Sequence, residues 1–243
     1  MSSFLYGIVQ LSLDGMAAAS VRLTRGGLPM RRKTEDRRLS FVTAAKDLFI
    51  EQGFGAVTME AIALRAGASK ATLYNYFLSK EALFEAFVSE AGKGGLEDLE
   101  AARQDGSAQD VLHHLGLAYL DLVTRPDVIE VNRLIMGEAR RQPQLSRIFY
   151  ENGPRKTLIA ICETIGLLME RGDLRRSEIR QAGLYFKALC EAGLVERQLW
   201  GLDQVPDATI RRAAVEDATT IYLRAFATHE MPPRGDEARD SEA

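Results

Sequence analysis

Cysteine is scarce in this sequence: Cys162 and Cys190 are the only two, and they do not form a CxxC pair. A disulfide framework and a zinc-finger module are therefore excluded, and such cysteine usage is typical of the reducing cytoplasm, where we expect this protein to act. With 20 Gly and 7 Pro among 243 residues, the chain has few turn-forming residues for a β-rich fold. No run approaches the roughly 18 consecutive apolar residues that a membrane helix needs, so we expect no membrane contact.

Motifs for catalysis and for cofactor binding are also missing. The glycine-rich residues 92–95 lack the spacing and the following strand of a phosphate-binding loop. His113 and His114 are adjacent, so they would face about 100° apart on a helix and could not chelate a metal as an i, i+4 pair does. We expect no enzymatic activity, no metal and no cofactor. A helical enzyme and an all-helical module that acts through protein contacts remain as alternatives.

Charge is distributed unevenly along the chain. The formal net charge is −3, but residues 1–82 carry 11 Lys and Arg against 7 Asp and Glu, whereas the remainder carries 20 against 27. This asymmetry is typical of a small anion-binding domain attached to a larger acidic body. Beside a DNA-reading unit, a cluster of cations would clamp phosphates or the minor groove; alone, it would be a solvated arm. The cluster consists of Arg31, Arg32, Lys33, Arg37 and Arg38.

The two ends of the chain lack a pattern that predicts packed structure. Residues 4–13 are mildly apolar, but the first cation is Arg22, so a secretory signal is not expected. We expect residues 1–30 to be a disordered extension, with Met16 or Met30 as an alternative start of translation. The acidic residues 231–243 are expected to be a disordered tail.

Helical periodicity begins at Phe41, and a first helix is expected to end near Gln52 and Gly53. Its apolar face consists of Phe41, Ala45, Leu48 and Phe49. The N-cap residues Thr58, Ser69 and Ser79 predict three further helices, the third of the four covering only residues 70–77. Two short helices joined by a tight turn that contains Gly67, behind a bracing helix, describe a helix-turn-helix unit.

The third of these helices has an unusually polar and aromatic outer face. At 100° per residue, Leu73 and Phe77 point inward, whereas Lys70, Tyr74 and the remaining side chains point outward. Lys and Tyr suit phosphate contacts, and Thr and Asn suit contacts to base edges. A surface helix whose tyrosines pack over the first helix is the alternative. The expected DNA-binding residues are Thr58, Ser69, Lys70, Ala71, Thr72, Tyr74, Asn75, Tyr76 and Lys80.

Residues 41–84 resemble the N-terminal domain of TetR-family transcriptional regulators. The matching motifs are Ala44-Ala45, Leu48-Phe49, Gly53-Phe54, Thr58-Met59, Ile62-Ala63, Ala66-Gly67, Ser69-Lys70, Thr72 to Phe77 and Ser79-Lys80-Glu81. The resemblance implies an all-α homodimer that binds a palindromic DNA operator, usually as a repressor that a small-molecule effector releases. By position, it also implies phosphate contacts from Thr58, Tyr74, Tyr76 and Lys80, and entry of Lys70, Ala71 and Thr72 into the groove. At position 60, some relatives carry a cation that reads a base, whereas this sequence has Glu60. Its carboxylate would either cap the helix or accept a hydrogen bond from a cytosine amine, and we favour capping.

The remainder of the chain also has helical periodicity. Helices are expected over residues 80–91, 108–123, 126–143, 154–169, 177–200 and 206–229, with a short element through residue 150. Residues 132–154 resemble the C-terminal domain of AefR-like members of the same family. Gly92, Gly94 and Gly95 predict either a simple break between two helices or a hinge that responds to the effector. We therefore expect an all-α fold with a helix-turn-helix domain over residues 31–79 and a ligand-binding and dimerisation domain over residues 80–230.

Two sets of residues are candidates for the functions of this second domain. An apolar and aromatic pocket for a hydrophobic or aromatic effector would be lined by Phe87, Tyr119, Leu134, Met136, Phe149, Tyr185 and Phe186. The last two helices mix small and apolar residues on their inner faces, which favours either a four-helix dimer interface or packing within one subunit. The interface residues would be Ala182, Phe186, Cys190, Gly193, Ile210, Ala214, Ala218 and Ile221.

Overall fold

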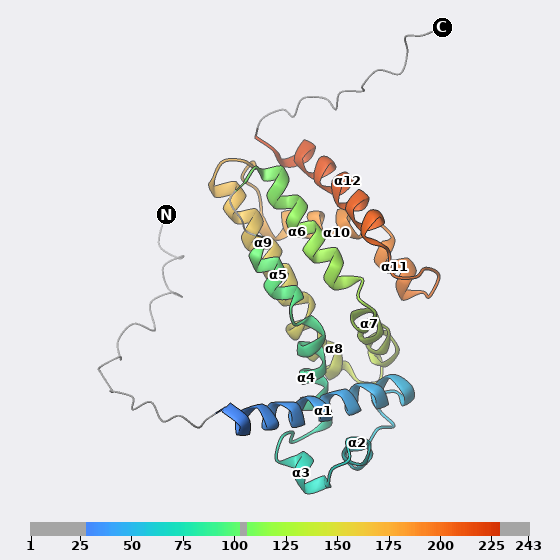
Figure 1. Ribbon diagram of the computed structural model, residues 1–243. Helices are drawn as coiled ribbons and strands as arrows, with labels where there is room; N and C mark the ends of the chain where they lie inside the picture. The colour runs from blue at the N-terminus through green and yellow to red at the C-terminus, as the bar shows by residue number, and fades with distance from the viewer. Residues whose placement is uncertain (1–27, 103–105, 229–243) are drawn as a thin grey trace, which may run out of the picture. The chain divides into compact units, whose positions relative to one another are not determined.

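The structure is a computed structural model that describes residues 28–102 and 106–228 (Figure 1). The predicted tail over residues 231–243 and most of the predicted extension lie outside the described residues, as do the side chains of Arg31, Arg32 and Lys33. The chain from Arg38 onward forms one compact unit, and the packing below is that of this unit. The described residues before it, 28–37, form the first part of a helix.

The described residues contain twelve helices and no strand, apart from one isolated bridge between Leu174 and Ala227. This confirms the predicted all-α fold. The helices are α1 (Leu28–Gln52), α2 (Met59–Arg65), α3 (Lys70–Tyr74), α4 (Lys80–Gly92), α5 (Gly95–Ala101), α6 (Ala108–Val123), α7 (Pro126–Glu138), α8 (Pro143–Asn152), α9 (Pro154–Glu170), α10 (Ile179–Glu191), α11 (Leu194–Leu199) and α12 (Ala208–Phe226).

Local capping signals determine where α2, α3 and α4 begin. The side-chain oxygen of Thr58 accepts a hydrogen bond from the backbone N–H of Ala61 at 3.1 Å. Ser69 and Ser79 accept equivalent bonds, at 3.1 and 3.2 Å, from the residues three positions on. Each bond satisfies one backbone donor that a helix N-terminus otherwise leaves without a partner. The three predicted starts are confirmed.

Helix ends differ from the predictions at several places. Helix α7 ends at Glu138 and not at residue 143, and α12 covers Ala208–Phe226 and not residues 206–229. Helix α1 begins at Leu28, so residues 28–30 of the expected extension belong to it. Helix α3 ends at Tyr74, before the predicted residue 77, because the chain leaves the helix in a turn in which the N–H of Tyr76 donates to the carbonyl of Leu73 at 2.9 Å. The single helix predicted over residues 177–200 is wrong: α10 and α11 are separated at Ala192 and Gly193, whose φ angles are +24° and +87°.

The glycine segment after α4 forms a break between two helices. Helix α4 ends at Gly92, and Gly94 has φ of +80°, a left-handed conformation that glycine adopts without the steric cost of a side chain. Gly95, the first residue of α5, is needed for a different reason. A Cβ atom built there would lie 2.6 Å from Cδ1 of Leu122 on α6. The break is therefore observed, and hinge motion at this segment stays a prediction.

Two hydrophobic cores hold the described chain together. The first joins α1, α2 and α3 to α4, α7 and α8. It contains a group of phenylalanine rings in which the centroids of neighbouring rings lie 5.0–6.3 Å apart: Phe49, Phe54, Phe84 and Phe87. The second lies among α5, α6, α9, α10 and α12, where Tyr119, Phe186 and Tyr222 are almost completely buried. The first core crosses the domain boundary expected at residue 79, since Val131 and Ile135 of α7 belong to it.

Candidate DNA-binding face and effector pocket

The short helix α3 presents a polar face and buries an apolar one. Leu73 is 0% exposed and Phe77, just after the helix, is 5% exposed, so the predicted inward pair is confirmed. Tyr74 keeps 39% of its surface exposed. Lys70, Ala71 and Asn75 are also exposed, whereas Thr72 and Tyr76 are half-buried. The outer face therefore carries a cation, an amide, a hydroxyl and two phenols within seven residues.

An ion pair joins the beginning of α3 to the beginning of α2. The ammonium of Lys70 contacts the carboxylate of Glu60, and it also lies 5.7 Å from the centroid of the Tyr74 ring. The hydrogen bond from Lys70 lowers the pKa of Glu60, and the same bond raises the pKa of Lys70. Both side chains are more than half exposed. Sequence reasoning treated Glu60 as a helix cap and missed this pair, because the pair depends on the angle between two helices.

Three of the expected phosphate contacts also hold the domain together. The Nζ of Lys80 donates to the carbonyl of Phe54 at 2.9 Å and lies 4.6 Å from the centroid of its ring. The ring of Tyr76 packs 5.5 Å from that of Phe41. Thr58 caps α2, and the hydroxyls of Ser69 and Thr72 lie 2.8 Å apart at the beginning of α3. Contacts of Lys80, Tyr76 and Thr58 with phosphate stay a prediction, and so do the DNA contacts of Ser69 and Thr72.

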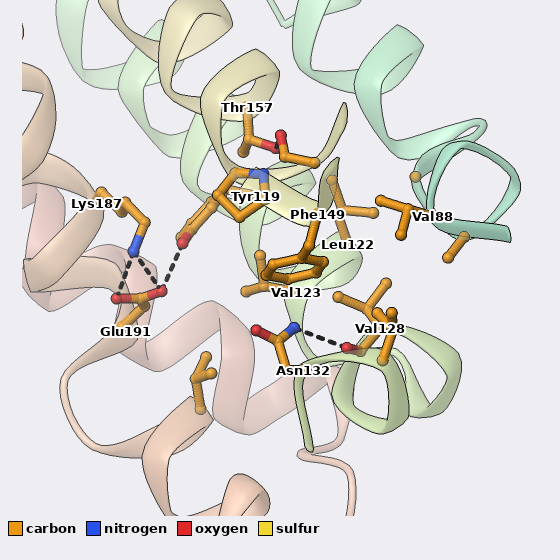
Figure 2. A pocket seen from close by; sticks show the side chains of 16 residues that line it. Val88, Tyr119, Leu122, Val123, Val128, Asn132, Phe149, Thr157, Lys187 and Glu191 are labelled. Carbon is orange, nitrogen blue, oxygen red and sulfur yellow. Dashed lines mark hydrogen bonds and ion pairs between the residues drawn. The ribbon is translucent and has the colours of Figure 1, made fainter. Parts of the chain in front are cut away.

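A cavity of about 140 Å³ lies in the larger domain, among helices α4 and α6 to α11 (Figure 2). Most of its wall is apolar, with side chains that include Val88, Leu122, Val123, Val128 and Phe149. One end is polar and carries Tyr119, Lys187 and Glu191 (Figure 2). An apolar wall with a few polar groups is the usual construction of a small-molecule site.

The polar end of the cavity is internally hydrogen-bonded. The hydroxyl of Tyr119 donates to Oε1 of Glu191 at 2.6 Å, and Nζ of Lys187 lies 2.8 and 2.9 Å from the two carboxylate oxygens. Burial, followed by the charge of Glu191, raises the pKa of Tyr119 well above that of an ordinary tyrosine. On α7, the side-chain N–H of Asn132 donates to the carbonyl of Val128 at 2.7 Å, which leaves the amide oxygen as an acceptor.

The structure distributes the predicted pocket residues among three environments. Tyr119 and Phe149 line the cavity. Phe87 and Phe186 are buried in the two cores, and Leu134 packs against the first core. Met136 and Tyr185 are 62% and 51% exposed. Sequence reasoning missed Asn132, Lys187 and Glu191, because polar residues on an amphipathic helix are normally assigned to the outer face.

The predicted interface residues are likewise divided. Ala182, Phe186, Cys190 and Ala218 are buried within the chain, where α10 packs against α9 and α12. Ala214 is half-buried and Gly193 is exposed. Ile210 and Ile221 on α12 are 47% and 50% exposed. These two, with Tyr185 on α10, leave apolar surface on the two helices.

Within the described residues, no group of three or more His, Cys, Asp and Glu side chains is arranged to hold a metal ion. His113 and His114 have ring centroids 6.2 Å apart, and the two cysteines are free thiols. No helix in this part of the chain is long and apolar enough to cross a bilayer.

Family models match most of the described chain. Residues 41–87 match the model for bacterial regulatory proteins of the tetR family. Residues 110–228 match the model for the C-terminal domain of AefR-like transcriptional repressors. The two matched regions contain the candidate DNA-binding face and most of the residues around the cavity.

Three of the curated relatives are named as HTH-type transcriptional regulators. YvkB of Bacillus subtilis, an uncharacterized HTH-type transcriptional regulator, is 32% identical over 185 residues, which cover 75% of this chain and 93% of YvkB. YdeS of the same organism is 36% identical over 35% of this chain and 41% of YdeS. UidR of Escherichia coli K12 is 29% identical over 48% of this chain and 59% of UidR. The alignments with YdeS and UidR thus span only about half the length of those relatives.

Solved structures have the same fold. The flavonoid-responsive regulator FrrA is 29% identical and covers 81% of this chain and 100% of its own, with a TM-score of 0.68. A TetR-family regulator from Mesorhizobium loti is 22% identical, covers 81% of this chain and 99% of its own, and has a TM-score of 0.70.

Proposed function

Because this chain belongs to the TetR family of regulatory proteins, as its resemblance at both domains implied, we propose that it is a transcriptional repressor. It binds a palindromic operator as a homodimer in the cytoplasm, and a small hydrophobic or aromatic effector releases it. The outer face of α3, with Lys70, Tyr74 and Asn75 exposed around a buried Leu73, is the observation that carries this proposal. A short helix with such a face suits a major groove.

In this proposal, each residue of the face has a role in reading duplex DNA. Lys70, Ala71 and Thr72 enter the groove, and Asn75 contacts a base edge. Tyr74, Tyr76, Thr58 and Ser69 contact phosphates, which orient the domain. Lys80 uses two of its N–H groups on the carbonyls of Phe54 and Gly55, at 2.9 and 3.5 Å, which leaves the third for a phosphate.

Dimerisation follows from the proposed operator. Two recognition helices must lie about 34 Å apart, one turn of DNA, to read the two halves of a palindrome. The exposed apolar side chains of Tyr185, Ile210 and Ile221 on α10 and α12 support an interface in which a second copy covers the same two helices.

Helix α7 offers a connection between the pocket and the DNA-binding domain. Val128, Val131 and Asn132 line the cavity, and Val131 also belongs to the first core. On the same helix, Glu130 lies 3.9 Å from Lys46 of α1. A bound effector would favour a spacing of the dimer's two DNA-binding domains that does not fit successive major grooves. A coupling of roughly 1–3 kcal/mol would change operator affinity by about 5–150-fold.

Similarity to FrrA supports an aromatic effector, because that relative is described as flavonoid-responsive and flavonoids are aromatic molecules. The mostly apolar wall of the cavity supports the same class.

The double variant Lys70→Ala/Tyr74→Ala tests this function. The purified wild-type protein should bind a fragment of its own promoter in dilute buffer and lose affinity steeply as salt rises. The double variant should lose this binding while light scattering shows an intact dimer. Lys156→Ala/Tyr150→Ala removes the same residue types from exposed positions on α8 and α9 and should bind like the wild type. Undiminished binding by the first variant would refute the assignment of the face, and a module that acts only through protein contacts would show no salt-dependent binding of DNA.

A further inference from the structure

We propose that the cavity binds a small, neutral aromatic molecule that carries a hydroxyl group, and that Glu191 accepts the hydrogen bond from this hydroxyl. The inference rests on the proposed function, because it specifies the chemistry of the effector. It goes further in assigning a selective role to one charged side chain.

The volume of the cavity matches a ligand of about one ring. This volume of about 140 Å³ is close to the roughly 150 Å³ of an apolar protein cavity that binds benzene. The side chains of Val123, Val128 and Phe149 surround this space and offer an apolar surface for the ring (Figure 2). A single substituted ring therefore fits the space and the wall.

The polar end offers acceptors to a ligand. Oε1 of Glu191 receives bonds from both Tyr119 and Lys187, whereas Oε2 receives one bond from Lys187. Each carboxylate oxygen has two acceptor positions, so Oε2 retains one. Tyr119 donates its hydrogen to Glu191 and keeps acceptor capacity on its oxygen. A ligand hydroxyl can donate to these acceptors, whereas an ether or a ketone cannot.

The charges at this end favour a neutral ligand. Lys187 and Glu191 form an ion pair, so their charges cancel. Tyr119 brings no charge, because a tyrosine is protonated at neutral pH and burial raises its pKa further. A carboxylate ligand would place a second negative charge beside Glu191, and the single positive charge of Lys187 is already balanced by that residue. A ligand of the same shape with a carboxylate in place of the hydroxyl should therefore bind poorly.

Calorimetry on the DNA-free protein with three matched probes tests the proposal: p-cresol, p-xylene and p-toluate. We expect p-cresol to bind at least tenfold more tightly than p-xylene, since a hydrogen bond to a charged acceptor contributes more than one between neutral groups. p-Toluate should bind more weakly than either. Glu191→Gln should reduce the affinity for p-cresol about fivefold to tenfold and leave that for p-xylene unchanged, because the shape is retained and the charge is lost.

Glu196→Gln, at an exposed position on α11 outside the cavity, is the matched control and should bind all three probes like the wild type. A merely structural role of Glu191 would reduce the affinity for p-cresol and p-xylene by the same factor, which would overturn the proposal. Equal binding of the two probes by the wild type, or absence of binding by all three, would overturn it as well. DNA binding is measured separately. If the protein binds DNA but does not prefer p-cresol, only this inference is refuted. If it prefers p-cresol but binds no DNA, only the proposed function is refuted.

Discussion

The ion pair between Glu60 and Lys70 should weaken the electrostatic attraction between the DNA-binding domain and DNA. Both side chains lie at the first turns of the two helices of the helix-turn-helix, and both are more than half exposed. While Glu60 stays beside Lys70, the cation contributes little net charge toward the phosphates. Replacing Glu60 by Gln keeps the shape and a hydrogen-bond acceptor but removes the opposing charge.

The size of the effect follows from counterion release. Each additional cation that neutralises a phosphate steepens the dependence of log affinity on log salt by about 0.9 for duplex DNA. With two domains in the proposed dimer, Glu60→Gln should steepen this slope by about 1.8. Between 50 and 200 mM salt, a fourfold change, the variant should therefore lose about 12-fold more affinity than the wild type. At the lowest salt it should bind more tightly than the wild type.

Fluorescence anisotropy with the promoter fragment at several salt concentrations measures this slope directly. The control is Glu100→Gln on α5, which makes the same change of charge at an exposed position in the larger domain. An unchanged slope in Glu60→Gln, or an equal change in Glu100→Gln, would refute the reasoning. If Glu60 instead accepts a hydrogen bond from a cytosine amine, Glu60→Gln should weaken operator binding at low salt and relax the preference at one base pair.

Three further predictions concern stability, measured by urea denaturation. Gly95→Ala should lower the free energy of unfolding by about 1–3 kcal/mol because the added methyl group has no space, whereas Gly92→Ala, where nothing lies within 4 Å, should change it by less than about 1 kcal/mol. Equal effects would contradict the packing argument. Phe84→Ala should cost about 3–5 kcal/mol, since it leaves a cavity among the rings of the first core; a loss below 1 kcal/mol would show that this core is not tightly packed. Raising the pH should also destabilise the fold, because burial raises the pKa of Cys190 to about 12 and that of Tyr119 above its ordinary value, so the folded state keeps protons that the unfolded chain releases. The loss should begin near pH 9 for the thiol and near pH 10 for the phenol, at up to about 1.4 kcal/mol per pH unit for each group; a flat profile between pH 9 and 11 would contradict the burial of both.

The DNA-binding domain was predictable because its structure is determined locally. A hydroxyl at an N-cap bonds to a backbone N–H three residues on, so Thr58, Ser69 and Ser79 identify their own helix starts. The inward position of Leu73 follows equally from helical periodicity. The pairing of Glu60 with Lys70 was not predictable, because it depends on how two helices cross.

The pocket could not be predicted because a cavity is a property of several helices at once. Periodicity tells which face of a helix is buried but not how closely the facing helices approach each other. Large aromatic residues such as Phe87 and Phe186 therefore appeared as wall residues, although burial in a core is the more favourable position for a ring. Conversely, Lys187 and Glu191 are i, i+4 neighbours, a spacing that normally indicates a solvated ion pair on an outer face. Only the packing of α10 against α6, which brings Tyr119 within hydrogen-bond distance of Glu191, places that pair in a cavity wall.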